Sequence, residues 1–224
     1  MSNRILSVRH LGLVDYASAL IIQRQTEQAI KSALQSDTLL LLEHPHTLTV
    51  GRRGDNSSVL LDETELRAAG VSLFETNRGG KVTYHGPGQL VGYPIVNLSP
   101  DREDVHRFVR DLEEVLIRTL ADFQIKGFRI EGLTGVHTGR GKVAAIGVHI
   151  SRWITTHGFA LNVNTNLKYF DMIIGCEGEP VTSMEQILGD EIDLAVVADR
   201  VVEHFVQVFS MELASTTSHQ PVLV

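Results

Sequence analysis

The sequence predicts a single α+β domain, with a mixed, mostly antiparallel sheet packed against helices. Strand-like segments cluster along the chain while regular amphipathic helices are few, a distribution typical of this class. The 224 residues contain no internal repeat and no obvious linker, which favours one domain over two. We place the domain at residues 1–213 and expect a disordered tail at 214–224, where Ser and Thr are frequent.

The first half of the chain is expected to consist mainly of strands. Asp15 is a suitable cap for a helix that runs to about Gln35, and Gly70 is suited to end a short helix over 61–69. The apolar run 38–43 has the composition of a strand covered on both faces. Further strands are expected at 5–8, 47–51, 71–74 and 90–96, with a polar loop at 52–58.

The second half contains the two clearest helices. Apolar residues recur at helical spacing over 104–123 and again over 194–209, which predicts helices with one core-facing side. Strands are expected at 127–130, 143–153 and 159–163.

Composition excludes several classes of function. A net charge of −7 and an isoelectric point near 5.8 argue against nucleic acid as a partner, because binding to phosphates requires a basic surface. The single cysteine cannot form an intramolecular disulfide, which fits a reducing compartment. The N-terminus has no secretory apolar region and no stretch is long enough to span a membrane, so we expect a cytoplasmic protein with no membrane partner.

The stretch 78–89, RGGKVTYHGPGQ, is the most constrained segment of the chain. Its four glycines permit unusual backbone conformations and close approach of a ligand, while Pro87 restricts φ. Two structures fit this composition: a loop that binds a ligand, and a tight hairpin that carries polar side chains. The stretch has neither the Walker spacing nor the dinucleotide-binding spacing, so no nucleotide cofactor is predicted.

Two residues stand out as candidates for chemistry. Cys176 lies between an apolar pair and a Gly/Pro-rich turn, and it is either an inert core thiol or a nucleophile. Lys142 begins a strand of small apolar residues, where it is either solvated or drawn towards a buried site in which it would activate a thiol.

The ten histidines raise the question of a metal site or a Cys/His dyad. The candidates are His44, His46, His85, His137, His149 and His157. His85, within the glycine-rich stretch, is singled out, either as a chemical group or as a residue that ties the loop together. The chain has no His-Glu-x-x-His motif and no second cysteine, so no metal is predicted.

Four blocks in order resemble the lipoyl(octanoyl) transferase family. The first is RGGKVTYHGPGQLVGYP at 78–94, and the next two are GKVAAIGV at 141–148 and HGFALNV at 157–163. The fourth is Cys176 followed by VTSM at 181–184. The matching region runs from about residue 38 to 188, which makes the resemblance far more specific than a single glycine pattern.

The resemblance implies the fold of biotin and lipoate protein ligases and a defined reaction. An octanoyl or lipoyl group would pass from acyl carrier protein to a lysine on a lipoyl domain, through a thioester on the enzyme. The acceptors would be the E2 subunits of 2-oxo acid dehydrogenases and the H protein of the glycine cleavage system. No cofactor is implied.

The resemblance also implies the site residues. The catalytic pair falls on Cys176 and Lys142. The substrate-binding residues fall on three segments: Arg78, Gly79, Gly80, Lys81, Val82, Thr83, Tyr84 and His85; Ala145, Ile146 and Gly147; Gly158, Phe159 and Ala160. Arg52, Arg53, Arg78, Lys81 and Arg140 are either a basic rim that steers acidic carrier proteins or scattered solvated charges.

The chain departs from the family pattern in two places. Gly175, Glu177 and Gly178 surround the cysteine where the family has Pro-Cys-Gly-Ile, and His137 stands where the family often has tryptophan.

Three other functions are compatible with the sequence. An ATP-dependent lipoate ligase on the same fold would not need Cys176, and a Cys176/His85 hydrolase would use water in place of the amine. A non-catalytic acyl-binding module would keep Cys176 as a buried, inert thiol.

Overall fold

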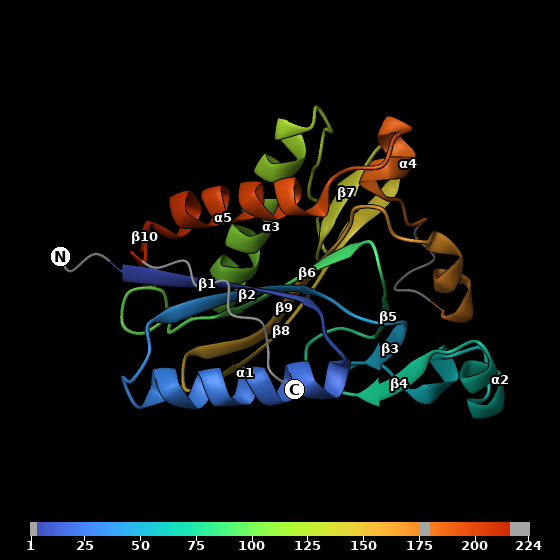
Figure 1. The fold of residues 1–224 in the computed structure, drawn as a ribbon, viewed down its shortest axis with the longest axis horizontal. Helices are drawn as coiled ribbons and strands as arrows, with labels where there is room; N and C mark the ends of the chain where they lie inside the picture. Colours follow the sequence, from blue (N-terminus) through green and yellow to red (C-terminus); the bar gives the residue numbers. More distant parts are fainter. Residues whose placement is uncertain (1–3, 175–179, 216–224) are drawn as a thin grey trace.

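A seven-stranded mixed sheet forms the middle layer of the protein, with helices on both faces (Figure 1). The computed structural model describes residues 4–174 and 180–215. The strand order is β10-β1-β2-β6-β9-β8-β7. The strands span β1 Arg4–Leu13, β2 Asp37–Glu43, β6 Gln89–Ile95, β7 Val136–Thr138, β8 Gly141–Ser151, β9 Ile154–Asn162 and β10 Met211–Leu213. Strand β1 runs parallel to β2 and β10, and the other pairs are antiparallel.

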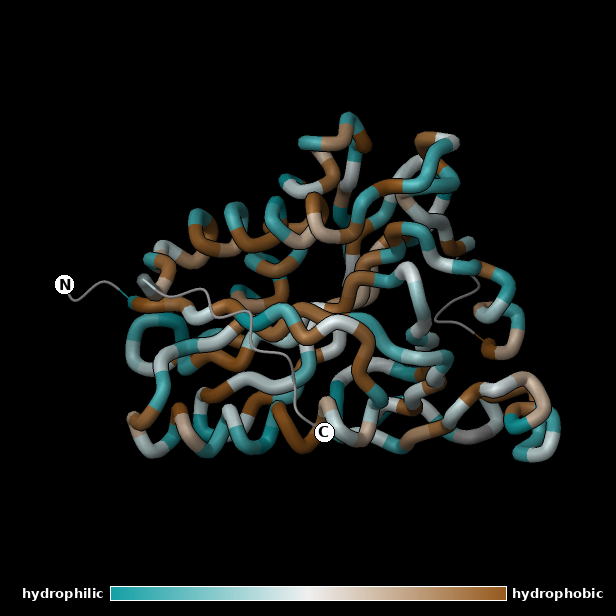
Figure 2. Tube along the Cα trace, viewed as in Figure 1, coloured by the Kyte–Doolittle hydropathy of each residue, from teal (hydrophilic) through white to brown (hydrophobic). Residues whose placement is uncertain are grey.

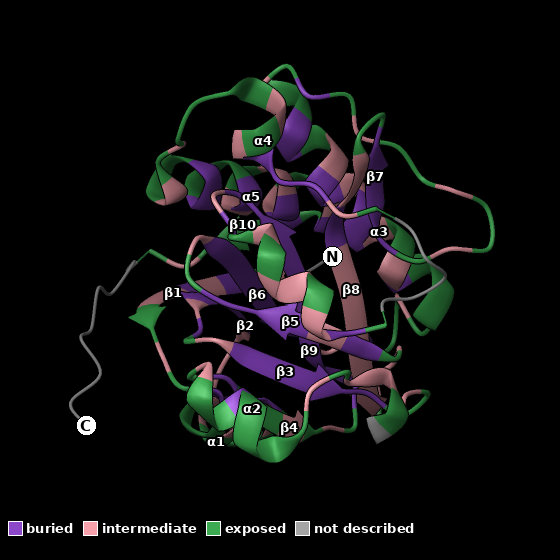
Figure 3. Ribbon diagram, turned by 90° about the vertical axis from the view of Figure 1, so that its right-hand side faces the viewer, coloured by how far each residue is buried: buried purple, intermediate pink, exposed green. Residues whose placement is uncertain are grey.

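A smaller three-stranded sheet lies beside the large one, in the order β4-β3-β5. Its strands are β3 Thr47–Val50, β4 Ser72–Glu75 and β5 Val82–His85. The short helix α2, Glu63–Ala68, and the two 3-10 helices, η1 Asn56–Ser58 and η2 Leu167–Met172, accompany it. Figure 3 shows that β3 is buried while α2 is largely exposed.

The helices cover the two faces of the large sheet unequally. Helix α1, Tyr16–Lys31, lies on one face, and α3, Val105–Asp122, and α5, Leu194–Phe209, lie on the other (Figure 1). A fourth helix, α4, spans Met184–Leu188. Along β2, Leu39 and Leu41 join the core under α3 and α5, while Leu40 and Leu42 join the core under α1. This alternation explains why the segment is apolar without interruption.

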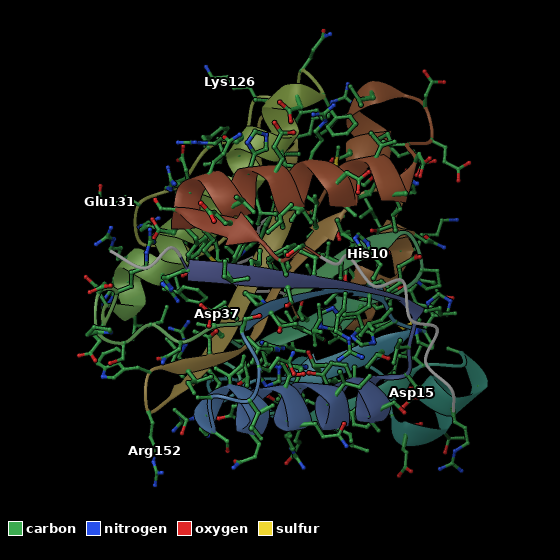
Figure 4. The ribbon with its side chains drawn as sticks, turned by 60° about the vertical axis from the view of Figure 1, so that its left-hand side comes forward. His10, Asp15, Asp37, Lys126, Glu131 and Arg152 are labelled. Atoms are coloured by element: carbon green, nitrogen blue, oxygen red, sulfur yellow. The ribbon has the colours of Figure 1, made fainter. Side chains whose placement is uncertain are left out.

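Most predicted elements are confirmed, and the predicted fold class is confirmed with them. Asp15 and Asp104 cap their helices through side-chain hydrogen bonds to Ser18 and Arg107 (Asp15 is labelled in Figure 4), and the 194–209 helix has the predicted limits. Apolar residues gather along the central strands (Figure 2). Strand β10 ends at Leu213, and the predicted tail lies mostly outside the described residues.

Three predictions about elements were wrong. The first helix ends at Lys31 rather than near Gln35, and Ala33 has a φ of 55° that a helix cannot contain. The segment 127–130 is not a strand, since only Phe128 forms a bridge, with His137. The glycine-rich stretch is not a continuous loop, because residues Val82–His85 form β5 and pair with β3.

Candidate active site

A cavity of about 220 Å³ lies between the glycine-rich stretch and strands β8 and β9. Three segments that are far apart in the sequence form its walls: 78–85, 144–147 and 157–160. Strands β8 and β9 are antiparallel neighbours, with Ala145 opposite Ala160 and Gly147 opposite Gly158. Figure 3 shows β5, β8 and β9 close together near the centre of the view.

The structure brings together nearly all of the residues predicted to bind substrate. Every one of them lines the cavity except Gly79 and Tyr84. Gly79 donates its backbone N–H to Val148 O at 2.9 Å and so attaches the glycine-rich stretch to β8. Tyr84 is fully buried in the smaller sheet, where its hydroxyl contacts His46 Nδ1 at 2.7 Å and its ring stacks on Tyr169.

The close approach of the glycine-rich stretch to β8 depends on Gly147. A Cβ at this position would lie 2.7 Å from Gly79 O and 3.3 Å from Arg78 Cδ. A Cβ does not approach a backbone oxygen as closely as 2.7 Å, so any side chain at 147 would displace the backbone at Gly79. The glycine therefore permits the two walls of the cavity to meet.

Arg78 is a structural anchor of the cavity wall. It is buried, and its guanidinium donates to Thr49 Oγ1, Thr49 O and Gly79 O at 2.5–3.1 Å. A guanidinium is always charged, so a buried one requires such acceptors. Arg78 therefore lies inside the protein and not on an exposed rim.

The other predicted rim cations lie in different places. Arg53 and Lys81 are exposed and line the cavity. Arg52 lines a separate groove beside α1, and Arg140 donates to Gln186 O at 2.6 Å. The cations at the cavity are therefore fewer than the five considered from the sequence.

His85 is held in one tautomer by a buried amide. Its Nδ1 lies 2.8 Å from Gln89 Oε1, and Gln89 Nε2 donates to Tyr84 O and Asn162 Oδ1. Because the Gln89 amide nitrogen is used by two acceptors, its oxygen receives the proton on His85 Nδ1. Burial holds the pKa of His85 well below its ordinary value, so the ring is neutral and its Nε2 is an acceptor.

Neutral aromatic and imidazole rings close one end of the cavity. Tyr16, Tyr93 and His157 line it with His85, and the Tyr16 and His85 rings are stacked at 6.0 Å. Burial lowers the pKa of His157 to about 3 and raises the pKa of Tyr16 to about 12. No ring at this end is charged at neutral pH, which suits an apolar ligand.

Lys142 lines the cavity and is connected to the segment that precedes α4. Its backbone N–H donates to Pro180 O at 2.8 Å, and its carbonyl accepts from Thr182 N at 2.9 Å. Ile173 and Val181 also line the cavity. The predicted nucleophile, Cys176, lies outside the described residues, as do its neighbours Gly175, Glu177 and Gly178.

Asn162 joins the glycine-rich stretch to the chain beside Lys142. Its Oδ1 accepts from Gln89 Nε2 at 2.9 Å, and its Nδ2 donates to Thr182 O at 3.0 Å. A chain of hydrogen bonds therefore runs from His85 through Gln89 and Asn162 to Thr182, and from Thr182 N–H to Lys142. Such a buried, satisfied network restricts its members to one arrangement.

Several cavity residues were not identified from the sequence. Gln89, Tyr93 and Asn162 lie within the blocks that carry the family resemblance, so those blocks were a usable signal. His157 was considered from the sequence only as a histidine of a metal site or a Cys/His dyad. Tyr16 lies outside these blocks, so no comparable signal pointed to it. Residues 132–134 also line the cavity, although they belong to an irregular connection.

Two further properties concern the whole described part of the chain. Residues 4–174 and 180–215 contain no group of three or more His, Cys, Asp or Glu side chains arranged to hold a metal ion. None of the helices in these ranges is long and apolar enough to cross a bilayer.

Comparison with known proteins identifies the family. An octanoyltransferase from Solibacter usitatus is 52% identical over 207 residues, which cover 92% of this chain and 94% of that protein. A bipartite lipoate protein ligase from Thermoplasma acidophilum shares the fold, with a TM-score of 0.76, 14% identity and coverage of 98% of this chain and 88% of that chain.

A biotin protein ligase from Aquifex aeolicus is a more distant neighbour in fold, with a TM-score of 0.53, 15% identity and coverage of 94% and 71%. The family model described as "Lipoyl protein ligase A/B catalytic domain" matches residues 15–206. The chain therefore belongs to the family of lipoyl protein ligase A/B catalytic domains.

Proposed function

We propose that this protein is an octanoyltransferase that moves an octanoyl or lipoyl group from acyl carrier protein to a lysine of a lipoyl domain. The main support for this proposal is the cavity that the glycine-rich stretch, β8 and β9 form together. Lys142 lies in the wall of this cavity, and neutral rings line one end of it. Relatives that are 41–52% identical over most of the chain bear the name octanoyltransferase. The protein is accordingly an acyltransferase that acts in lipoate biosynthesis.

Cys176 serves as the nucleophile in this proposal. Ile173 and Val181 flank the segment that carries it, and both line the cavity. Cys176 is three residues from Ile173, which limits the separation of their Cα atoms to about 11 Å at about 3.5 Å per residue. The same rule keeps Cys176 within about 14 Å of Pro180, whose carbonyl is bonded to Lys142. Chain geometry therefore supports a thiol near this cavity.

The reaction takes place in two exchanges at the carbonyl carbon. The Cys176 thiolate attacks the octanoyl thioester of the carrier, the carrier thiol leaves, and Lys142 supplies its proton. The amine of the acceptor lysine then attacks the new thioester, an amide forms, and Cys176 leaves as thiolate. Lys142 takes the proton that the attacking amine loses. The first step replaces one thioester with another and the second forms an amide, so no nucleotide is consumed.

The cavity suits an eight-carbon chain. The contribution of burying methylenes is about 0.8 kcal/mol each, so the six additional methylenes of octanoyl over acetyl contribute roughly 5 kcal/mol. This corresponds to roughly three to four orders of magnitude in binding. The apolar residues Ala145, Ile146, Phe159 and Ala160 provide the contact surface.

The state of His85 argues against the Cys/His hydrolase. A general base is most effective when its pKa lies near the working pH. Burial holds the pKa of His85 far below neutrality, so this ring would accept a proton from a thiol poorly. Its hydrogen bond to Gln89 supports a role in shaping the cavity wall.

Intact-protein mass spectrometry with octanoyl-acyl carrier protein tests the proposal. We expect wild type to gain the mass of one octanoyl group on Cys176, and to pass it to a lipoyl domain without ATP. Cys176→Ser should give neither product while keeping the native circular dichroism spectrum. Turnover that requires ATP and free octanoate would show a ligase, and free octanoate as the only product would show a hydrolase. If wild type gains no octanoyl group and its Cys176 thiol is alkylated slowly, the protein would be a non-catalytic acyl-binding module.

A further inference from the structure

Glu113 is a buried carboxylate on the face of α3 that packs against the sheet. Its side chain is fully buried, although the residue lies in a helix whose other buried positions are apolar except for Thr119. Arg110 Nη1 donates to its Oε2 at 2.7 Å, and Arg129 Nε donates to the same oxygen at 3.1 Å. The backbone N–H of Gly135 donates to Oε1 at 3.1 Å. Both oxygens therefore have partners, as a buried charge requires.

Two of these partners are the ends of one connecting segment. Residues 129–135 lead from the region after α3 into β7. Glu131, within this segment, lies at the edge of the molecule (Figure 4). Arg129 begins this segment and Gly135 ends it, so one carboxylate holds both ends. Residues 132–134, between these two points, line the cavity. An irregular segment with exposed residues is thus attached to a helix at two points.

The end of this segment lies against the side chain of Lys142. Gly135 has a φ of 120°, and a Cβ built on it would lie 2.8 Å from Lys142 Cε and 3.5 Å from Lys142 Nζ. It would also lie 2.5 Å from Ala144 O. The backbone of Gly135 therefore borders the end of the lysine side chain that carries the amine.

We propose that Glu113 is a positioning residue for acyl transfer, which acts by holding Gly135 against the arm of Lys142. The inference rests on the proposed function only in assigning Lys142 a part in the reaction. A lysine side chain has four rotatable bonds, so its ammonium reaches many positions unless neighbouring atoms exclude them. Displacement of a reacting group by about 1 Å can lower a rate by about 100-fold. No hydrogen bond or ion pair joins Glu113 to Lys142, and Glu113 does not line the cavity, so its effect passes through the backbone of Gly135.

Two substitutions separate the hydrogen bond to Gly135 from the ion pairs. Glu113→Gln keeps an acceptor oxygen at the same reach but removes the charge. Glu113→Asp keeps the charge for the two arginines but shortens the side chain, so that it does not reach Gly135. We expect Glu113→Gln to stay within about threefold of the wild-type kcat, and Glu113→Asp to lose about 10- to 100-fold with little change in KM for octanoyl-acyl carrier protein.

The alkylation of Cys176 by iodoacetamide as a function of pH is the second readout. If Lys142 is displaced, the profile of Glu113→Asp should move in the same direction as that of Lys142→Ala. A merely structural role would lower the unfolding midpoint and leave the profile of the folded protein unchanged. Gly135→Ala, which pushes directly on Lys142, should reproduce the profile of Glu113→Asp.

Glu114→Gln is the matched control. Glu114 is the next residue of α3, and its Oε2 accepts a hydrogen bond from Arg129 Nη2 at 2.8 Å. The hydrogen bond from Gly135 N–H goes to Glu113 and not to Glu114. Its substitution should leave kcat and the alkylation profile unchanged. Equal losses in Glu113→Asp, Glu113→Gln and Glu114→Gln, or a wild-type profile in Glu113→Asp, would overturn the inference. If Lys142→Ala itself left kcat and the profile unchanged, the part that the proposed function gives to Lys142 would have failed, whereas a shifted profile in Lys142→Ala beside a wild-type profile in Glu113→Asp would refute the role of Glu113 alone.

Discussion

The side-chain amide of Asn162 donates a hydrogen bond of 3.0 Å to the backbone carbonyl of Thr182. Asn162 is the last residue of β9, and Thr182 is bonded through its own N–H to Lys142. The bond therefore connects the strand that forms one cavity wall to the chain beside the lysine. Both residues are buried, so water cannot replace the bond.

Substitution of Asn162 tests whether this connection serves the site. Asn162→Ala leaves the carbonyl of Thr182 without this donor, and we expect a loss of about 1–3 kcal/mol in the free energy of unfolding. We also expect a lower rate of acyl transfer, because the backbone on either side of Thr182 is released. Urea unfolding and steady-state kinetics measure the two effects.

Asn164→Ala is the control for this prediction. Asn164 makes a comparable pair of bonds, from Nδ2 to Ile192 O at 2.7 Å and from Ile192 N to Oδ1 at 3.0 Å, but it does not contact the chain beside Lys142. It should lose similar stability without losing rate. Equal kinetic losses in the two variants would mean that the Asn162 bond has no special connection to the site.

Replacement of Lys142 should alter the reactivity of Cys176. A nearby ammonium favours the thiolate, so Lys142→Ala should move the iodoacetamide profile of Cys176 to higher pH by about one unit. Cys176 is the only cysteine, so alkylation reports on a single thiol. Lys81→Ala, which removes an exposed cation of the same cavity, should cause a smaller shift. Identical profiles in wild type and Lys142→Ala would remove the lysine from the proposed pair.

A methyl group at position 147 should open the cavity wall. The added Cβ of Gly147→Ala meets a backbone oxygen, Gly79 O, which cannot move aside as a flexible side chain would. We expect a loss of about 1–3 kcal/mol in stability and a higher KM for the octanoyl donor. Gly139→Ala is the control, because a Cβ there would meet no atom within 4 Å. Unchanged KM in Gly147→Ala would mean that the wall contributes nothing to acyl binding.

Stability should fall as the pH is lowered from about 6.5. Burial lowers the pKa of His44 to about 4 and that of His157 to about 3, so the unfolded chain binds protons in this range that the native state does not. Each histidine then contributes a slope of up to about 1.4 kcal/mol per pH unit, and stability is lost towards acid.

Comparison with His44→Gln isolates one histidine. Burial raises the pKa of Asp37, so this residue makes stability rise as the pH is lowered. Asp37 is present in both proteins, so it does not affect the comparison between them. Glutamine retains one donor and one acceptor for Val14 O and the Tyr93 hydroxyl, which His44 now contacts. Urea unfolding between pH 7 and 5 should therefore show a shallower slope for the variant. Parallel slopes would contradict a neutral, buried His44.

The sequence by itself was sufficient for the elements whose signal is local. Apolar spacing over 104–123 predicts α3, Asp15 predicts the start of α1, and the four consecutive leucines within 38–43 predict a central strand, because capping and periodicity are read from neighbouring residues. The first three motif blocks likewise identify most of the cavity lining, since each of them contributes one of its three walls.

Only the tertiary structure decided the features that depend on contacts between distant segments. Residues 82–85 form a strand because β3 supplies their partners, and Arg78 is buried because Thr49 supplies its acceptors. Glu113 is the buried carboxylate of a helix whose other buried residues are apolar except for Thr119, and sequence spacing treats such a residue as solvated. Its environment comes from Arg129 and Gly135, which lie 16 and 22 positions later and meet the carboxylate only when the chain has folded.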